Sequence, residues 1–161
     1  MKLYMKQKIL FFRDRFTVFD EASNPAYYVE GELLSLTKKL HIYDQNHHEV
    51  ALVKQQMITF LPKFSVEVNG VEVAEIVKEI SFFRPKYHIR GLQWDIVGNV
   101  FEHDYEIHDG NKTIVTIHKE WWSFSDAFVL DIEDKNQLIY ALSVVLAIDC
   151  VLDAQQQANN D

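Results

Sequence analysis

The stretch that decides the fold is LIYALSVVLAIDCVL, residues 138–152. Of its 15 residues 13 are apolar, and Ser143 and Asp149 are the interruptions. This run predicts a helix over about 135–153 that is hydrophobic on nearly all sides. At about 1.5 Å per residue it spans roughly 22 Å, less than the roughly 30 Å hydrocarbon layer of a bilayer, inside which Asp149 would be costly. We therefore expect a buried core helix and no transmembrane span.

The residues on either side of this helix mark its limits. Asp134 with Gln137 suits a capping box, and Asp131 and Glu133 add negative charge at the positive end of the helix dipole. Residues 154–161, AQQQANND, have no apolar periodicity and predict a polar tail that is frayed or disordered. The chain is thus expected to form one domain over 1–153.

The chain before the helix predicts a sheet. Between Ile9 and Ile132 it consists of short segments rich in Val, Ile, Phe, Tyr and Thr, separated by turn residues such as 20–24, 69–70 and 109–111. The connections are short and carry no helical crossovers, so the strands should pair antiparallel in a meander.

Residues 72–80 fit two patterns. Val73, Ile76, Val77 and Ile80 fall at helical spacing, with glutamates on the other side. The same stretch echoes 49–55 with one residue inserted, which is what a β-bulge would do to a strand. We favour the strand.

The strand region also contains an internal repeat. Residues 42–55, IYDQNHHEVALVKQ, align without a gap to residues 107–120, IHDGNKTIVTIHKE, and each copy predicts strand, polar turn and strand. Three more matches keep the same order: 16–18 with 87–89, 27–31 with 94–98, and 64–66 with 128–130. The chain is therefore expected to contain two halves of about six strands.

A sheet of about twelve strands is large for an open form, and closing it into a barrel removes both edges. Such a barrel is too wide to be filled by wall side chains alone, and a helix about 10 Å across suits its lumen. We expect a mainly β fold, a closed antiparallel barrel around the C-terminal helix. Ser143, Asp149 and Cys150 would then need internal partners or places near the barrel mouth.

The sequence resembles the LURP-one-related family, whose relatives are the phospholipid scramblases and the C-terminal domain of tubby proteins. The resemblance covers essentially the whole chain and lies in the strands of Gly31 and Gly98, in 49–51 and 113–115, in Trp121-Trp122 and in the closing helix. It implies a tubby-like twelve-stranded barrel around a central hydrophobic helix and no established enzymatic activity.

The related families suggest lipid ligands, since tubby domains resemble phosphoinositide-binding modules and scramblases are lipid-linked and calcium-responsive. This chain lacks the cysteine-rich and proline-rich stretches of scramblases, so scramblase-like lipid handling is only an alternative. An acidic cluster, Asp131, Glu133, Asp134 and Asn136, lies roughly where scramblases carry a proposed calcium segment. It lacks the central glycine and closing glutamate of an EF-hand loop, so we interpret it as helix capping.

Basic residues supply the candidate binding site. By analogy with tubby domains, a phosphorylated lipid headgroup would bind Lys38, Lys39 and Lys54 on neighbouring strands. Two other clusters of basic residues occur in the sequence. One is Arg13 with Arg15. The other is Arg84 with Lys86 and Arg90, and these three residues are included in the candidate headgroup site. The alternative is that these lysines bind nothing and lie on a solvated strand face, because lysine commonly protects a sheet against pairing with other chains.

Two adjacent tryptophans offer another contact. Neighbouring strand residues face opposite ways, so one of Trp121 and Trp122 would pack in the core and the other would anchor a partner or a membrane interface.

Metal and catalytic motifs are weak. The densest group, His41, Asp44, His47 and His48, lacks the spacing of a zinc site and is interpreted as surface turn residues. Residues 102–104 (Glu-His-Asp) and 108–109 (His-Asp) offer acid and base types without a nucleophile. The five glycines form no phosphate-binding loop. An enzyme with a carboxylate and histidine site at the barrel mouth is retained as the alternative function.

Composition limits the partners and the compartment. A net charge of −8 over 161 residues argues against nucleic acid, and one cysteine allows no intrachain disulfide. The charged N-terminus resembles no secretory signal, so a cytoplasmic location is expected. The combined prediction is a non-catalytic binding or scaffold module without cofactor or metal, with a phosphoinositide or a protein as partner.

Overall fold

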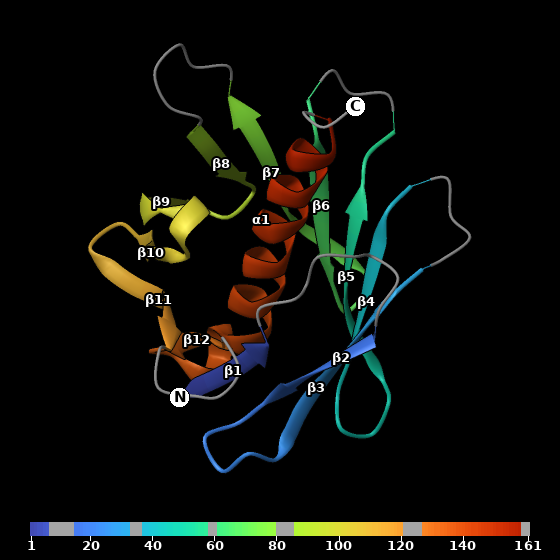
Figure 1. Cartoon of the computed structure of the whole chain (residues 1–161), viewed down its shortest axis with the longest axis vertical. Coiled ribbons are helices and arrows are strands. Elements are labelled where there is room, and N and C mark those ends of the chain that lie inside the picture. The colour runs from blue at the N-terminus through green and yellow to red at the C-terminus, as the bar shows by residue number, and fades with distance from the viewer. Residues whose placement is uncertain (7–14, 33–36, 58–60, 80–85, 121–126, 159–161) are drawn as a thin grey trace.

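In the described part of this computed structural model, twelve strands form one antiparallel sheet that wraps almost completely around one long helix (Figure 1). The structure describes residues 1–6, 15–32, 37–57, 61–79, 86–120 and 127–158. The strands are β1 (Lys2–Lys6), β2 (Arg15–Phe19), β3 (Pro25–Gly31), β4 (Lys39–Tyr43), β5 (Glu49–Gln55), β6 (Lys63–Val68), β7 (Val71–Glu79), β8 (Lys86–Arg90), β9 (Trp94–Asn99), β10 (Asp104–Asp109), β11 (Lys112–Glu120) and β12 (Ala127–Ile132). The helices are the short 3₁₀ turns η1 (Val100–Glu102) and η2 (Lys135–Gln137) and the α-helix α1 (Leu138–Ala158).

Strand order confirms the predicted barrel. The sheet runs β8-β7-β6-β5-β4-β3-β2-β1-β12-β11-β10-β9, and every pair in it is antiparallel. The first strand joins the two halves, because β1 pairs with β12 along its whole length, from Lys2 opposite Asp131 to Lys6 opposite Ala127. The sheet ends at β8 and β9, so the barrel is nearly closed rather than fully closed.

The halves predicted from the repeat can be followed in the strand order. Strands β2 to β6 occupy the matched segments of the first half and β8 to β12 those of the second. The gapless alignment is wrong by one residue on the second strand of the repeated hairpin. Ile42 pairs with Ala51, which the alignment matches to Thr116, but Ile107 pairs with Val115. The reason is turn length, since five residues separate Tyr43 from its partner Glu49 and four separate His108 from Thr113.

Helix α1 is the core of the barrel, as its all-round apolar sequence predicts. Residues 141–148 are each at most 1% exposed, and the helix packs mainly against β5, β6 and β7 (Figure 1). The 21-residue segment Lys135–Gln155 is long and apolar enough to cross a membrane, and 72% of an 18-residue apolar stretch within it is buried inside the protein. Its apolar surface is therefore already covered by the wall.

Both ends of the helix depart in detail from the sequence prediction. Asp134 caps η2 instead of α1 directly, accepting a hydrogen bond of 2.9 Å from the Asn136 amide. At the other end α1 continues through Ala158, five residues beyond the end predicted at 153. Inside the barrel the Ser143 hydroxyl donates to the Ile139 carbonyl at 2.6 Å, which satisfies the buried serine locally.

Residues 71–79 form a strand, which confirms the favoured reading of that segment. The inserted residue is Val73: Val66 pairs with Ala74 and Glu67 pairs with Glu72, leaving Val73 as the extra residue of a bulge.

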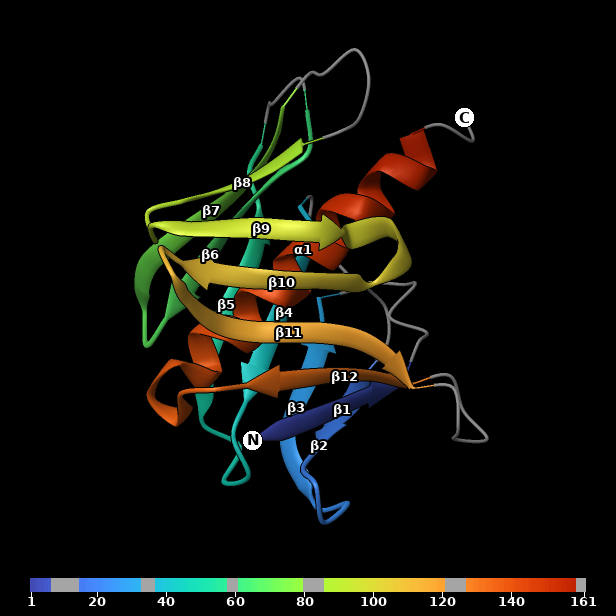
Figure 2. The ribbon, with the colours of Figure 1, turned by 90° about the vertical axis from the view of Figure 1, so that its left-hand side faces the viewer.

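That bulge lies next to the opening of the barrel. Gly91, in the connection from β8 to β9, has φ +93°, and a Cβ atom there would lie 2.5 Å from the Val73 carbonyl oxygen. The connection therefore folds closely against β7, and only a residue without a side chain fits. β9 continues as the partner of β10 instead of pairing back with β8, as Figure 2 shows.

Candidate functional site

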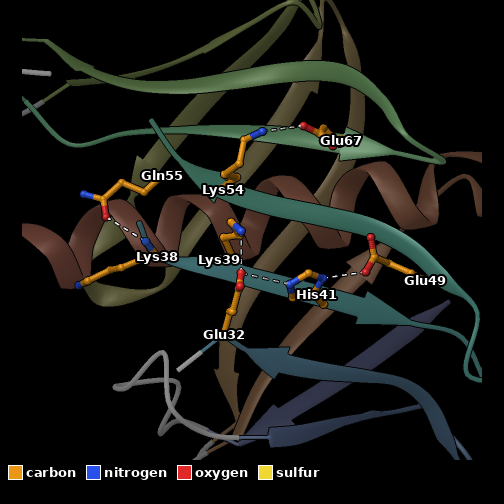
Figure 3. A network of polar contacts seen from close by, with 8 residues as sticks. All are labelled: Glu32, Lys38, Lys39, His41, Glu49, Lys54, Gln55 and Glu67. Atoms are coloured by element: carbon orange, nitrogen blue, oxygen red, sulfur yellow. Dashed lines mark hydrogen bonds and ion pairs between the residues drawn. The ribbon is translucent and has the colours of Figure 1, made fainter. Parts of the chain in front are cut away.

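The lysines predicted to bind a headgroup lie on the outer face of β4 and β5 and beside it (Figure 3). Lys39 and Lys54 are register partners, so the prediction that they occupy neighbouring strands is confirmed. Each has a carboxylate within reach: Lys39 Nζ lies 2.8 Å from Glu32 Oε2, and Lys54 Nζ lies 3.2 Å from Glu67 Oε1. Lys38, just before β4, lies 3.4 Å from Asp153 Oδ2 near the end of α1.

Electrostatics on this lysine face are balanced. The hydrogen bond from Lys39 lowers the pKa of the Glu32 carboxyl, with a smaller effect of His41. His41 itself bridges two carboxylates, with Nδ1 2.7 Å from Glu49 and Nε2 3.7 Å from Glu32 (Figure 3). A phosphate that bound here would have to displace carboxylates already paired with the same cations.

The second basic group is divided among several places. Arg13, Arg84, Trp121 and Trp122 lie outside the described residues. Arg15 lies 3.3 Å from Glu30, and Arg90 on β8 lies 3.6 Å from Glu75. Lys86, at the start of β8, is exposed and has no ion pair within the described part of the chain.

The turn histidines point to separate partners. His48 lies 3.4 Å from Asp44, His47 stacks on Tyr28 at 5.0 Å between ring centroids, and His41 reaches Glu49 as described. The Asp44 carboxylate accepts the amide hydrogen bonds of Asn46 and His48 and so closes the turn. Across the described ranges, no three metal-ligating side chains converge.

One acid and histidine contact was not predicted from sequence. His103 Nε2 lies 3.3 Å from Asp149 Oδ1 on α1, although the geometry is not that of a hydrogen bond, so we treat the contact as electrostatic. The other side of the imidazole stacks on Phe128 at 4.1 Å. Asp149 thus lies beside a histidine that is far away in the sequence, while its Oδ1 accepts no hydrogen bond from the described residues.

Two reactive groups near this pair are deeply buried. The Tyr105 hydroxyl has no hydrogen-bond partner among the described residues, and burial, with the charge of Asp149, raises the pKa of Tyr105 well above 10.0. Burial also raises the pKa of the Cys150 thiol, and the neighbouring Asp149 and Asp153 add to the shift. The Cys150 sulfur therefore stays protonated and inaccessible.

The largest departure from a complete barrel lies between β8 and β9, where a cavity of about 300 Å³ opens. We call it the seam cavity. It is lined by residues of both strands and of η1: Lys86, Tyr87, His88, Ile89, Trp94, Asp95, Ile96, Gly98 and Val100. Figure 2 shows the two strands along the upper part of the wall, with α1 behind them.

The floor of the seam cavity is tied to the central helix. Tyr87 is only 8% exposed, and its hydroxyl donates to Gln155 Oε1 at 3.0 Å, while its ring meets Phe101 edge-on at 6.2 Å. Of the predicted site residues that the structure describes, the seam cavity includes Lys86 alone. A glycine within a strand, such as Gly98, is the signal in the sequence that could have indicated this site, because it marks close approach of backbone or ligand.

These features define a twelve-stranded antiparallel barrel around a C-terminal helix, with an opening between β8 and β9. The sequence profile of the LURP-one-related family matches residues 1–149, and the chain belongs to that family.

Two known proteins are similar over nearly the whole chain. The "Uncharacterized protein YxjI" of Bacillus subtilis (strain 168) is 28% identical over 152 residues, covering 94% of each chain. The X-ray structure of the Arabidopsis thaliana protein AT5G01750 superimposes with a TM-score of 0.62 at 14% identity, covering 92% of this chain and 91% of that one. The second likeness concerns the fold.

Proposed function

We propose that this protein is a non-catalytic binding module and that its ligand occupies the seam cavity. The observation that carries the proposal is the opening itself. In the first half of the barrel β2 and β3 pair directly, whereas the matching strands β8 and β9 of the second half are separated and line a cavity of about 300 Å³. That volume is at the lower end of the range for small-ligand sites.

The chemistry of the neighbouring groups supports binding rather than catalysis. The Cys150 thiol is buried and its pKa is raised, so it is a poor nucleophile. His103 and Asp149 form a contact that is packed against Phe128, as a structural pair would be.

A phosphorylated headgroup is the second candidate ligand, and one observation favours the seam cavity as its site over the lysine face. Lys86 lines the cavity and has no carboxylate partner in the described chain, while Lys39 and Lys54 are each paired with a glutamate. An anion gains more from a cation that is not already neutralised.

The proposal is tested by amide chemical-shift mapping of the isotope-labelled full chain, with inositol phosphates and a pool of short peptides as probes. We expect shifts at β8 and β9 with at least one probe, and recovery of that probe chemically unchanged. Shifts confined to β4 and β5, or conversion of a probe, would contradict the proposal.

Flotation with liposomes, with and without phosphoinositides, tests the headgroup candidate separately. If a headgroup binds in the seam cavity, Lys86→Gln weakens flotation and Lys39→Gln does not. Binding that depends on Lys39 would instead place the headgroup on the lysine face.

A further inference from the structure

We infer that the ligand of the seam cavity is an extended peptide segment of about five residues from a protein partner, which adds to the barrel as a strand between β8 and β9. This inference rests on the proposed binding function of the cavity and specifies its ligand.

The backbone of the two strands carries the first argument. β8 pairs with β7 and β9 pairs with β10, so each strand uses one edge and presents the other to the cavity. No hydrogen bond joins β8 to β9 within the described residues. Strand edges bind extended peptides through their free N–H and C=O groups. Here two such edges face one space, which suits a single inserted strand.

The side chains that line the cavity match the alternation of a strand. Tyr87, Ile89 and Trp94 point toward the core and are each at most 8% exposed. Lys86, His88 and Asp95, which alternate with them along the two strands, are exposed. A peptide with apolar and polar residues in alternation would place its apolar side chains over Tyr87 and Trp94 and its polar ones in water.

Charges at the two ends of the cavity set the direction of the peptide. Lys86 begins β8, at the end away from the β8–β9 connection, and Asp95 lies next to that connection on β9. A peptide carboxylate near Lys86 and a positive charge near Asp95 are complementary to this arrangement. Such a peptide runs antiparallel to β8 and parallel to β9.

The length follows from the strands. β8 has five residues and β9 has six, so a strand of about five residues matches the length of both edges.

The test uses a pentapeptide, Thr-Val-Thr-Val-Thr, with free amino and carboxyl ends, titrated into the labelled full chain. The matched control is the same peptide with N-methyl groups on both valine amides, which removes hydrogen-bond donors and keeps the side chains. We expect amide shifts in β8 and β9 and an apparent affinity at least about tenfold higher than that of the methylated peptide.

Charge variants test the direction. Lys86→Gln should weaken binding of the free peptide roughly threefold but leave binding of its C-terminally amidated form unchanged. Likewise, Asp95→Asn should weaken binding of the free peptide roughly threefold but leave binding of a peptide with a blocked amino end unchanged. Lys135→Gln and Glu72→Gln, which remove exposed charges elsewhere, are the control variants.

The outcomes separate this inference from the proposed function. Equal binding of the methylated peptide, or peptide-induced shifts outside β8 and β9, overturns strand addition. If inositol phosphates shift β8 and β9 and the pentapeptide does not, the binding function stands and the peptide inference fails. If neither probe binds up to about 10 mM, the inference is overturned together with the function it rests on.

Discussion

At the scale of single residues, backbone geometry rather than chemistry determines the important positions. Gly98 on β9 has φ +115°, and a Cβ atom there would lie 2.7 Å from the Asp104 carbonyl oxygen and 2.8 Å from Tyr105 Cα. Gly70, in the β6–β7 turn, also has a positive φ, +76°, but a Cβ atom there would meet nothing within 4 Å. A side chain at Gly70 would therefore cause backbone strain alone, whereas a side chain at Gly98 would cause both strain and steric collision.

We predict that Gly98→Ala lowers the free energy of unfolding by about 3 kcal/mol or more, because strain and collision add. Gly70→Ala should cost only about 1–2 kcal/mol, from its backbone conformation. Urea unfolding of both variants measures the difference, and equal costs would show that the β10 backbone moves away freely.

A second prediction concerns pH and two aspartates with opposite shifts. Hydrogen bonds from the His48 and Asn46 amides lower the pKa of Asp44 below 3.8, while burial raises the pKa of Asp153 above 3.8 despite Lys38. The stabilisation by Asp44 is thus present above pH 3.8 and disappears as the pH falls through the folded pKa. The contribution of Asp153 is most favourable below pH 3.8 and is lost as the pH rises through its folded pKa.

The corresponding measurement is urea unfolding at about pH 6 and about pH 3. Relative to Asp44→Asn, the unsubstituted protein should lose stability as the pH falls. Relative to Asp153→Asn it should gain stability over the same interval. Slopes of the same sign would contradict the assigned shifts.

At the scale of elements, the helix stabilises the barrel by filling it. Val144 on α1 is fully buried, whereas Val71 on β7 is 63% exposed. The same substitution at both positions therefore compares burial in the lumen with exposure on the wall.

We predict that Val144→Ala lowers the free energy of unfolding by about 2 kcal/mol or more, from lost methyl burial and the cavity that remains. Val71→Ala should cost less than about 1 kcal/mol, through strand propensity alone. Chemical denaturation checks both variants. A similar cost at the two sites would mean that the helix is not packed as described.

The sequence predicted the helix and the strands better than it predicted their pairing or the candidate site. The absence of a polar side on residues 138–152 predicted a helix surrounded by protein, and alternation with turn residues predicted the strands. The register of the repeated hairpin was not predictable from letter matches, because one extra turn residue moves every later pair. The carboxylate partners of Lys38 and Lys54 come from α1 and β6, and no local pattern indicates them.

At the scale of the whole molecule, the barrel stays open between β8 and β9 because of contacts between segments that no local sequence pattern links. The sequence favours complete closure because it removes both edges. In the structure the β8–β9 connection packs on the β7 bulge through Gly91, and β9 then pairs with β10. Contact between a turn and a bulge on another strand leaves no periodic signal, so strand patterning does not predict the seam cavity, and Gly98 within β9 is the local sign of it.

The opening predicts uneven protection of backbone amides. In β2 and β3 both edges have strand partners, whereas β8 and β9 each have a partner on one edge only. Hydrogen exchange of the protein without ligand should therefore be faster at the cavity-facing amides of β8 and β9 than at the matching amides of β2 and β3. Equal protection would indicate that the strands pair in solution and that the opening is closed.

The position of α1 after all twelve strands also determines how the chain must fold during synthesis. A ribosome that adds about 5–20 residues per second completes β12 about 1–5 seconds before the end of α1, and β1 has to wait for β12. Until the last turns of the helix leave the exit tunnel, the apolar inner faces of the strands have nothing to cover them. Newly made chains should therefore depend on holdase chaperones far more than the finished protein does, and truncation within α1 should direct them to proteolysis or inclusion bodies.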